Sequence, residues 1–318
     1  MKSMESTDAI THHAALDARM AKAAKGIRLL SLVSWPASEQ QTFLADYAQG
    51  RAKLPAYQYP KHDFSEARRE LAAIAAAADP THPLGIYLIE SAHSWQQAAE
   101  LLEQLGTARV AELSVALFGT PDHALPGGVT TREAAQHFLT VASELDNELL
   151  SGAEQVEISA TALALRLQAQ LDDFFDARVI EVELDPNLIA KAAAGSRKIR
   201  IRSGAAFSDY DMQQLLQHEA FVHSLTALNG QQQTVLPSMA LSSPRSTATQ
   251  EGLAVFAELI TGSIDIERMK RVSLRIEAVA MAMAGADFMQ VFRYFLDAGQ
   301  NQVESFTSAQ RVFRGVPT

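Results

Sequence analysis

Apolar residues recur at every third or fourth position through most of the chain, which is the spacing of amphipathic helices. Glycine and proline separate these segments and set their boundaries. The apolar run 27–32 fits a helix or a strand equally well, and residues 54–61, which include two prolines, predict an extended connector. In the N-terminal half we predict helices over residues 6–25, 38–50, 64–78, 96–105, 110–118 and 131–150.

Two interruptions are predicted ahead of the helix that begins at Gln96. Pro83 and Gly85 lie two residues apart, and both residue types disfavour the interior of a helix. Ser94-Trp95 forms a second break in the same stretch. We therefore expect the chain between the two breaks to be irregular.

The pattern changes after Ser159, where alternation with period two joins the helical spacing. Residues 177–184 and 198–202 alternate apolar and polar side chains, which predicts two half-buried strands. A short helix is expected between them over 186–194, and a loop rich in Ser and Gln covers 230–247. The chain therefore predicts an α+β fold that is predominantly helical with a small sheet. Further helices are predicted over residues 161–175, 209–228, 250–259, 266–284 and 288–298.

The composition bounds the organisation of the chain. Its 318 residues, 47% of them hydrophobic, can form one large domain or two smaller ones. We expect an N-terminal helical region, 1–158, and a second region, 159–318, packed together as one unit. Cysteine is absent from the sequence, which excludes disulfides and thiolate metal ligands and fits a reducing cytosol.

The net charge of −10 argues against nucleic acid as a partner, because a phosphate-binding surface is basic. Basic residues gather at 197–202 and at Arg268, Lys270 and Arg271, which we interpret as solvated faces of a strand and a helix. No apolar stretch reaches the roughly 18 residues of a membrane span. The N-terminal segment has acidic side chains and no apolar core, so no signal peptide is expected. We expect a cytoplasmic protein without a membrane segment, whose oligomeric state the sequence leaves open.

The strongest chemical signal is one segment that contains His218, Glu219 and His223. Neutral imidazole and carboxylate are good ligands for zinc, and a catalytic zinc site combines three protein ligands with a water molecule. Glu251 begins a downstream apolar helix and supplies a third ligand. A carboxylate that is not a ligand can act beside the water as a general base. These residues therefore form a plausible zinc hydrolase site.

The spacing of the two histidines has to be reconciled with one shared ion. Residues at i and i+5 lie about 140° apart on an ideal α-helix, which turns about 100° per residue. A π-bulge, which adds one residue to a turn, would bring His223 back to the face of His218. Alternatively, His223 lies in an irregular last turn, because Asn229-Gly230 is a stop signal. A third interpretation pairs Glu219 with His223 at i and i+4 without a metal.

Several ordered motifs lie in the C-terminal part of the chain. They are Ile199–Gly204, Phe207-Ser208, Leu215–Glu219 with His223, Leu228–Gln232, Thr249–Ala254 and Arg311–Gly315. With these motifs the chain resembles the bacterial family that is named for its QEGLA motif and for modulating flavohaemoglobin expression. Its eukaryotic relatives include the microtubule-associated tyrosine carboxypeptidases, and the N-terminal half matches only loosely.

This resemblance implies a zinc metallopeptidase that removes a C-terminal residue from a peptide or protein. It implies His218, His223 and Glu251 as the ligands of Zn2+ and Glu219 as the general base. The order of strands and metal helix along the chain is also compatible with the zincin enzymes, which place a sheet beside the active-site helix. We therefore expect a zincin-like sheet next to the helix that carries the histidines, with an edge strand able to pair with an extended peptide.

A carboxypeptidase also needs a cation for the terminal carboxylate of its substrate. Arg202, Arg311 and Arg314 are candidates, because guanidinium binds carboxylate through two parallel hydrogen bonds. The alternative function is a metal-binding regulatory or scaffold protein without proteolytic activity, which a closed metal site would favour. Members of the family continue past Arg311–Gly315, whereas this chain ends at Thr318. Either the protein is short or a C-terminal piece is missing.

Overall fold

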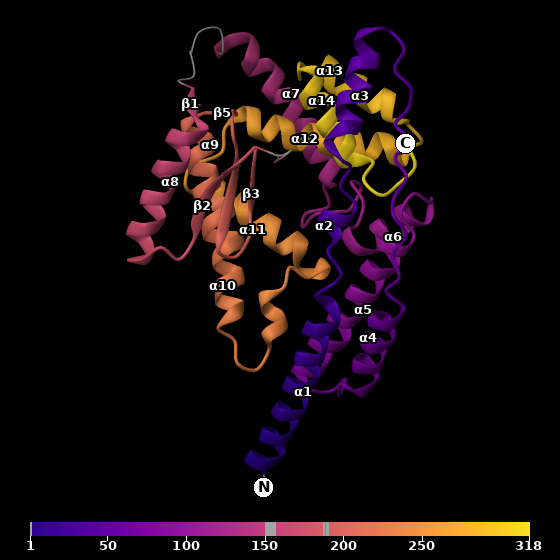
Figure 1. Cartoon of the computed structure of the whole chain (residues 1–318), viewed down its shortest axis with the longest axis vertical. Coiled ribbons are helices and arrows are strands. Elements are labelled where there is room, and N and C mark those ends of the chain that lie inside the picture. The colour runs from indigo at the N-terminus through magenta and orange to yellow at the C-terminus, as the bar shows by residue number, and fades with distance from the viewer. Residues whose placement is uncertain (1, 150–156, 187, 189–190) are drawn as a thin grey trace. The chain divides into compact units, whose positions relative to one another are not determined.

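The computed structural model describes residues 2–149, 157–186, 188 and 191–318 (Figure 1). The chain is predominantly helical with a small sheet, which confirms the predicted α+β fold. It forms two compact units whose segments alternate along the sequence, and the division at residue 158 stays a prediction. Unit 1 comprises Met1–Ala24, Glu70–His93 and Gly152–Asp265, and unit 2 comprises Lys25–Arg69, Ser94–Ser151 and Ile266–Thr318.

Most helices of the N-terminal half lie where the periodicity predicts them. The ambiguous run at 27–32 contains a short helix, and residues 54–61 have no regular structure, as predicted. Thr130 N–H donates to Glu133 Oε2 (2.7 Å) and Glu133 N–H to Thr130 Oγ1 (3.1 Å), a capping box at the start of α7. The helices are α1 (Lys2–Ala24), α2 (Leu29–Leu32), α3 (Ala37–Ala48), α4 (Ser65–Ala77), α5 (Pro83–Glu103), α6 (Arg109–Phe118) and α7 (Thr131–Leu149).

Helix α5 differs from the prediction, because it runs without a break from Pro83 to Glu103. Both predicted interruptions are therefore wrong. Pro83 occupies the first helical position, where its missing N–H removes no helical hydrogen bond. A Cβ atom at Gly85 would lie 1.9 Å from the carbonyl oxygen of Asp79, so packing requires glycine here. Trp95 is buried, and burial outweighs its modest helix propensity.

Unit 1 contains the main sheet, with strand order β2-β4-β3. Strands β2 (Glu181–Asp185) and β4 (Lys198–Arg202) are parallel, and β3 (Ala192–Ala194) pairs antiparallel with β4. A second pair joins β1 (Ile158–Ser159) to β5 (Ala206–Phe207). The predicted second strand coincides with β4, and the first begins later than predicted.

Strand β3 corrects the short helix predicted over 186–194. Residues 187, 189 and 190 of that segment lie outside the described residues. Ala192–Ala194 instead pair with Ile199–Ile201 of β4. Hydrogen bonding along the second edge of β4 outweighs the helix propensity of alanine, because strand preference depends mainly on neighbouring strands and packing.

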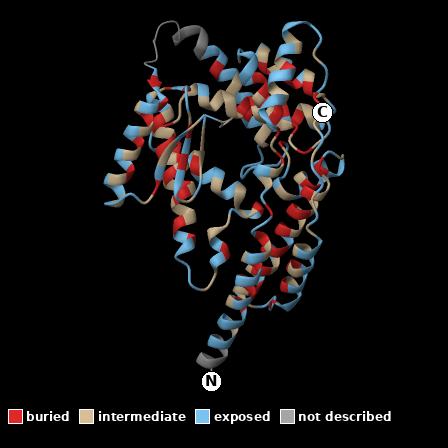
Figure 2. Ribbon diagram, in the orientation of Figure 1, coloured by how far each residue is buried: buried red, intermediate tan, exposed pale blue. Residues whose placement is uncertain are grey.

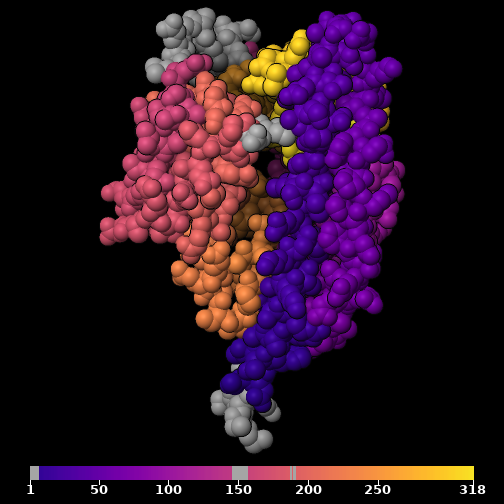
Figure 3. All heavy atoms as spheres, viewed as in Figure 1, coloured from indigo at the N-terminus to yellow at the C-terminus, as the bar shows by residue number. Residues whose placement is uncertain are grey.

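The core of unit 1 lies where helix α8 (Ala160–Phe175) packs on the sheet and on residues 212–220. Leucines of α8 at i, i+4 and i+8 share one buried face, and alternate isoleucines of β4 are buried in the same cluster. Buried residues gather here in Figure 2, and Figure 3 shows atoms of α8 at the outer surface on the left. These core residues are Leu163, Leu167, Leu171, Ile199 and Ile201.

The helix predicted over 209–228 is built from three consecutive segments. They are α9 (Asp209–Gln214), the π-helix η1 (Leu215–Ser224) and α10 (Leu225–Gln231). Ser208 begins α9 with a capping box, because its side chain accepts from Asp211 N–H (3.1 Å) and its own N–H donates to the Asp211 carboxylate (3.0 Å). The sheet contacts η1 through β3 and β4, as expected of a zincin-like arrangement.

Helix α10 continues past the predicted stop at Asn229-Gly230, which corrects that boundary. A Cβ atom at Gly230 would lie 2.4 Å from the carbonyl oxygen of Met239, so this glycine allows close packing and does not end the helix. The backbone that it contacts is held by Asp17, which accepts hydrogen bonds from the N–H (2.8 Å) and the hydroxyl of Ser238. The loop contains the short helices η2 (Pro237–Ala240) and η3 (Pro244–Ser246) and leads into α11 (Thr247–Ile260).

Unit 2 is closed by α12 (Ile266–Met283), α13 (Phe288–Asp297) and α14 (Gln302–Val312). The first two confirm predicted helices, whereas α14 was not predicted, although Asn301 accepts from Glu304 N–H (2.9 Å) as a recognisable cap. No helix in the described part of the chain is long and apolar enough to cross a membrane. Fully buried aromatic residues dominate the core of this unit: Phe288, Phe292, Phe295 and Phe306.

Candidate metal centre

Side chains from η1 and α11 converge in unit 1 on one small group of possible metal ligands, His218, His223 and Glu251. One ligand atom from each lies within 4.8 Å of the others. Nε2 of His218 is 3.6 Å from Glu251 Oε2, and Nε2 of His223 is 3.5 Å from Glu251 Oε1. Across the described ranges, no other histidines and carboxylates form a comparable group. The predicted ligand set is therefore brought together in space.

The π-helix explains how histidines five residues apart face the same point. In a π-helix each N–H bonds to the carbonyl five residues earlier, which places residues i and i+5 on one face. Leu225 N–H bonds to the carbonyl oxygen of Ala220 in this way, and the two imidazole centroids are 4.8 Å apart. The π-helical alternative is thus confirmed. The helix-end alternative is wrong, because α10 continues after His223.

Glu258 is a site residue that sequence reasoning missed. It lies seven residues after Glu251 on α11, so two helical turns bring both carboxylates to one face. Its side chain is fully buried, and Oε1 is 2.5 Å from Nδ1 of His218. A carboxylate only accepts hydrogen bonds, so Nδ1–H of His218 donates and Nε2 faces the ligand group. The i, i+7 spacing of the two glutamates was the signal available in the sequence.

The carboxylates dominate the electrostatics around His218. Burial disfavours its charged form, but hydrogen bonds with Glu251 and Glu258 and the charge of Glu219 outweigh burial and raise the pKa of His218 to about 9. The protein alone therefore holds a proton on this imidazole at neutral pH. Metal binding requires the deprotonated ring, so it has to displace that proton.

The geometry of the group fits a zinc ion. Ligand atoms about 2.0–2.2 Å from a tetrahedral zinc lie about 3.3–3.5 Å from one another. The two histidine nitrogens lie at similar distances, 3.6 and 3.5 Å, from the two different oxygens of Glu251, and one ligand atom from each residue lies within 4.8 Å of the others. The donor set of two imidazoles and one carboxylate is also one that zinc accepts in catalytic sites. The buried Glu258 carboxylate on the far nitrogen of His218 is the type of outer partner that orients such ligands.

The group is buried on one side and open on the other. The exposed fraction of the side chain rises from 7% at His218 to 23% at His223 and 58% at Glu251. Glu219, which follows His218 in η1, is half-buried and lies outside the ligand group. Its charge still acts on His218. Three ligands with one open side resemble a catalytic site more than a closed structural one.

Residues 41–318 of the chain match the family described as microtubule-associated tyrosine carboxypeptidase. The chain belongs to this family. The match includes the whole metal group and confirms the relation that the C-terminal motifs indicated. It also covers much of the N-terminal half, where the sequence resemblance was loose. No curated protein and no solved structure matches the chain.

In this member of the carboxypeptidase family, the three arginines predicted to bind substrate lie in different units. Arg202 ends β4 in unit 1, where its N–H donates to the carbonyl of Lys191 (2.9 Å). Arg311 lies in the last turn of α14 in unit 2, and Arg314 follows that helix. Their roles in substrate binding stay predictions.

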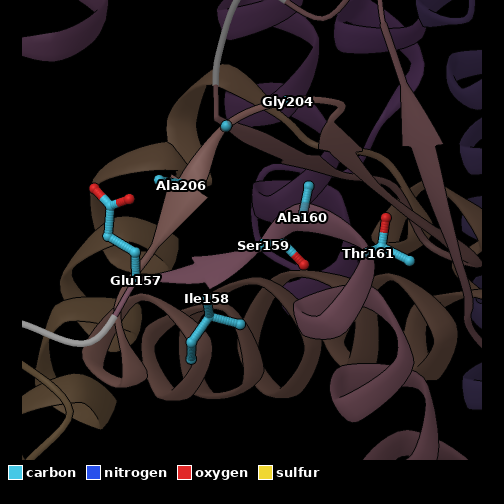
Figure 4. Close-up of a pocket in the computed structure, with 8 residues that line it drawn as sticks. Glu157, Ile158, Ser159, Ala160, Thr161, Gly204 and Ala206 are labelled. Atoms are coloured by element: carbon cyan, nitrogen blue, oxygen red, sulfur yellow. The ribbon is translucent and has the colours of Figure 1, made fainter.

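A second concavity of unit 1, about 380 Å³, lies where strands β1 and β5 meet the start of α8 (Figure 4). Ser159 caps α8 there, since its side chain accepts from Ala162 N–H (3.2 Å). None of the predicted site residues lines this depression, so it adds nothing to the metal group. Its lining residues are Glu157, Ile158, Ser159, Ala160, Thr161, Gly204, Ala205 and Ala206.

Proposed function

We propose that the protein is a zinc-dependent metallopeptidase that removes a C-terminal residue from a peptide or protein, as a tyrosine carboxypeptidase does. The observation that carries this proposal is the group of His218, His223 and Glu251, which has zinc-like separations and one open side. Membership in a carboxypeptidase family supports the reaction class. A closed four-ligand site would instead have favoured a structural metal.

In the proposed site, His218, His223 and Glu251 hold the metal and Glu258 fixes the tautomer of His218. Bound zinc supplies a Lewis acid for the scissile carbonyl oxygen and lowers the pKa of a water molecule. Glu251 is the most exposed of the three ligands, so the substrate approaches from its side of the group.

Glu219 acts as the general base in this proposal. It takes a proton from the attacking water and returns it to the nitrogen of the leaving amine. It lies next to His218 and outside the ligand group, which is the position expected of a base that acts beside the metal and is not a ligand. Arg202, Arg311 and Arg314 remain the candidates for binding the terminal carboxylate of the substrate.

Zinc content and peptide hydrolysis test the proposal together. We expect stoichiometric zinc in the purified protein and release of the last residue from peptides with a free C-terminus, but not from the same peptides with a C-terminal amide. His223→Ala should lose both the zinc and the activity, since two ligands hold zinc poorly. His137→Ala is the control, because His137 is exposed on α7.

The outcomes separate the alternatives. Full zinc occupancy in His223→Ala would show that the ligand assignment is wrong. A zinc-loaded protein that cleaves no peptide would favour the regulatory or scaffold function.

A further inference from the structure

A row of arginines follows one face of helix α12 in unit 2. Arg268, Arg271 and Arg275 stand at i, i+3 and i+7, which places them within about 60° of one another on a helix that turns about 100° per residue. The sequence suggests a solvated basic face here, but Arg268 and Arg271 are half-buried. Arg275 is also half-buried, and its Nε atom is fully covered by protein.

Helix α14 adds further positive charge to this row. It packs against α12 and carries Arg311 in its last turn, with Arg314 shortly after it. Arg311 remains exposed to solvent, although protein surrounds much of its guanidinium and lowers its pKa together with the charge of Arg268. Arg314 is half-buried, and its Nε atom is fully covered like that of Arg275.

Four of these arginines, Arg271, Arg275, Arg311 and Arg314, form no ion pair with a carboxylate among the described residues. The acidic residues of α12 that form ion pairs have other partners, since Glu277 pairs with Arg132 (3.2 Å) and Glu267 with Lys270 (3.4 Å). Among the described residues, the buried Nε atoms of Arg275 and Arg314 have no hydrogen-bond partner. A buried guanidinium nitrogen without a partner is costly, so such an arrangement is uncommon unless a ligand or a water molecule uses it.

Burial and the charges of Arg311, Arg268 and Arg271 lower the pKa of Arg275 to about 9. Burial likewise lowers the pKa of Arg314, with a contribution from Arg311. These shifts agree with the packing of α14 against α12, which brings the positive charges of the two helices near one another.

We propose that Arg275 and Arg311, with Arg271 and Arg314 beside them, form an oxyanion-binding site in unit 2 that takes a carboxylate or phosphate group. Guanidinium is planar and presents paired N–H donors that match the two oxygens of either group. Arg311 is exposed and therefore accessible to a ligand from solvent, whereas the Nε atom of Arg275 is covered by protein. The site extends the carboxylate role suggested for Arg311 and Arg314 to a residue that sequence reasoning missed, Arg275.

Calorimetric titration of the full-length chain with inorganic phosphate, at constant ionic strength set with chloride, tests the site. We expect Arg275→Gln and Arg311→Gln each to weaken phosphate binding about tenfold or more, because each removes charge-assisted hydrogen bonds. Arg293→Gln, which alters an exposed arginine on α13, should bind like the parent protein. The His223→Ala background repeats the titration without the proposed zinc site.

A second titration identifies the source of the oxyanion. A peptide with a free C-terminus and its C-terminal amide are compared in the Glu219→Gln background, so that the peptide is not cleaved. Preference for the free acid, lost in Arg275→Gln, assigns the site to a terminal carboxylate. Phosphate binding without peptide binding assigns it to a small inorganic anion.

The thermal midpoint of unfolding provides an independent check of phosphate binding. Phosphate should raise the midpoint of the parent protein more than chloride does at the same ionic strength, and Arg311→Gln should abolish the difference. Equal responses to phosphate and chloride, or equal binding by Arg275→Gln and Arg293→Gln, would overturn the site. Loss of peptide hydrolysis alone would not overturn the site, because anion binding is measured with phosphate or in the Glu219→Gln background, where no peptide is cleaved.

Discussion

Charged side chains of one sign gather in the metal group of unit 1 and in the proposed arginine site of unit 2. The charges have opposite signs in the two regions, and they shift the pKa values of neighbouring residues in opposite directions. Around His218, the carboxylates of Glu219, Glu251 and Glu258 favour an added proton and raise the histidine pKa to about 9. Around Arg275, burial and neighbouring arginines favour the loss of charge and lower the pKa to about 9. The first region therefore favours a positive charge, and the second disfavours one, which agrees with the proposed metal and oxyanion ligands.

The two regions also differ in how the protein satisfies its own polar groups. His218 has a buried partner for Nδ1, so the ring is oriented by the protein itself. The Nε atoms of Arg275 and Arg314 have no such partner within the described residues. A pre-oriented ligand group suits catalysis, which depends on fixed geometry, whereas the arginines are suited to binding.

The largest effect that tests the catalytic role of the metal group is expected for Glu219→Gln. The amide keeps the shape of the side chain but cannot accept a proton, so hydrolysis should fall by about 10²–10⁴-fold or more. Zinc content should stay unchanged, because Glu219 lies outside the ligand group. Both quantities are measured on the same preparation, with the exposed Glu181→Gln as a control.

Loss of zinc from Glu219→Gln would make this residue a ligand. Near-normal turnover would place the general base elsewhere in the site.

A smaller effect is expected for Glu258→Gln, which tests whether the Glu258 carboxylate orients the imidazole of His218 for metal binding. The amide oxygen can still accept from Nδ1–H of His218, but the negative charge is lost. We expect zinc affinity to fall by about 10–100-fold, as is usual when such an outer partner is changed. Competition with a chelator of known affinity measures the change. Unaltered affinity would mean that Glu258 serves packing and not the metal group.

Two glycine substitutions test whether the close backbone approach at Gly230 of α10 requires glycine. Gly230→Ala introduces a Cβ atom 2.4 Å from the Met239 carbonyl oxygen, so it should lower the free energy of unfolding by about 1–3 kcal/mol. Gly252→Ala, next to the ligand Glu251, has open space around its Cβ atom, so it should change stability by less than about 1 kcal/mol, in the favourable direction. Urea denaturation compares them, and equal effects would contradict the close approach at Gly230.

The smallest effect concerns Asp17, a buried charge that the fold satisfies with hydrogen bonds from Ser238. Burial raises the pKa of Asp17 despite these hydrogen bonds. A raised folded-state pKa means that its stabilising contribution is complete below the unfolded pKa and is lost as pH rises through the folded value. The parent protein should therefore gain stability relative to Asp17→Asn as pH falls from about 7 towards about 4.

Urea denaturation at several pH values measures that difference, and Asp297→Asn, at an exposed position, is the control. If the difference in stability between the parent protein and Asp17→Asn does not change with pH, the pKa of Asp17 is the same in the folded and the unfolded state.

Much of the secondary structure could be predicted because its signals are local. Helix starts such as Thr130 with Glu133 depend on residues three positions apart, and the alternation of β4 lies within one strand. The π-helical alternative followed from the spacing of His218 and His223 alone. These predictions required only the geometry of a helix and the ligand chemistry of the side chains.

The errors came from contacts with a neighbouring segment of the chain that the local pattern does not contain. Gly85 and Gly230 read as breakers, but each allows backbone from another segment to approach. Ala192–Ala194 have helical composition, but β4 supplies a pairing edge. No local pattern contains the position of such a neighbour, so propensity alone misassigned all three.

The sequence by itself indicated the candidate metal ligands, the mainly helical fold and the need for an irregular turn between the histidines, because each depends on residue chemistry or short-range periodicity. Only the tertiary structure decided that Glu258 orients His218 and that Arg275 joins Arg311, because those pairs come from separate helices whose packing brings them together. Burial and neighbouring charges together then shift the pKa values of His218 and Arg275, and both are properties of the folded chain.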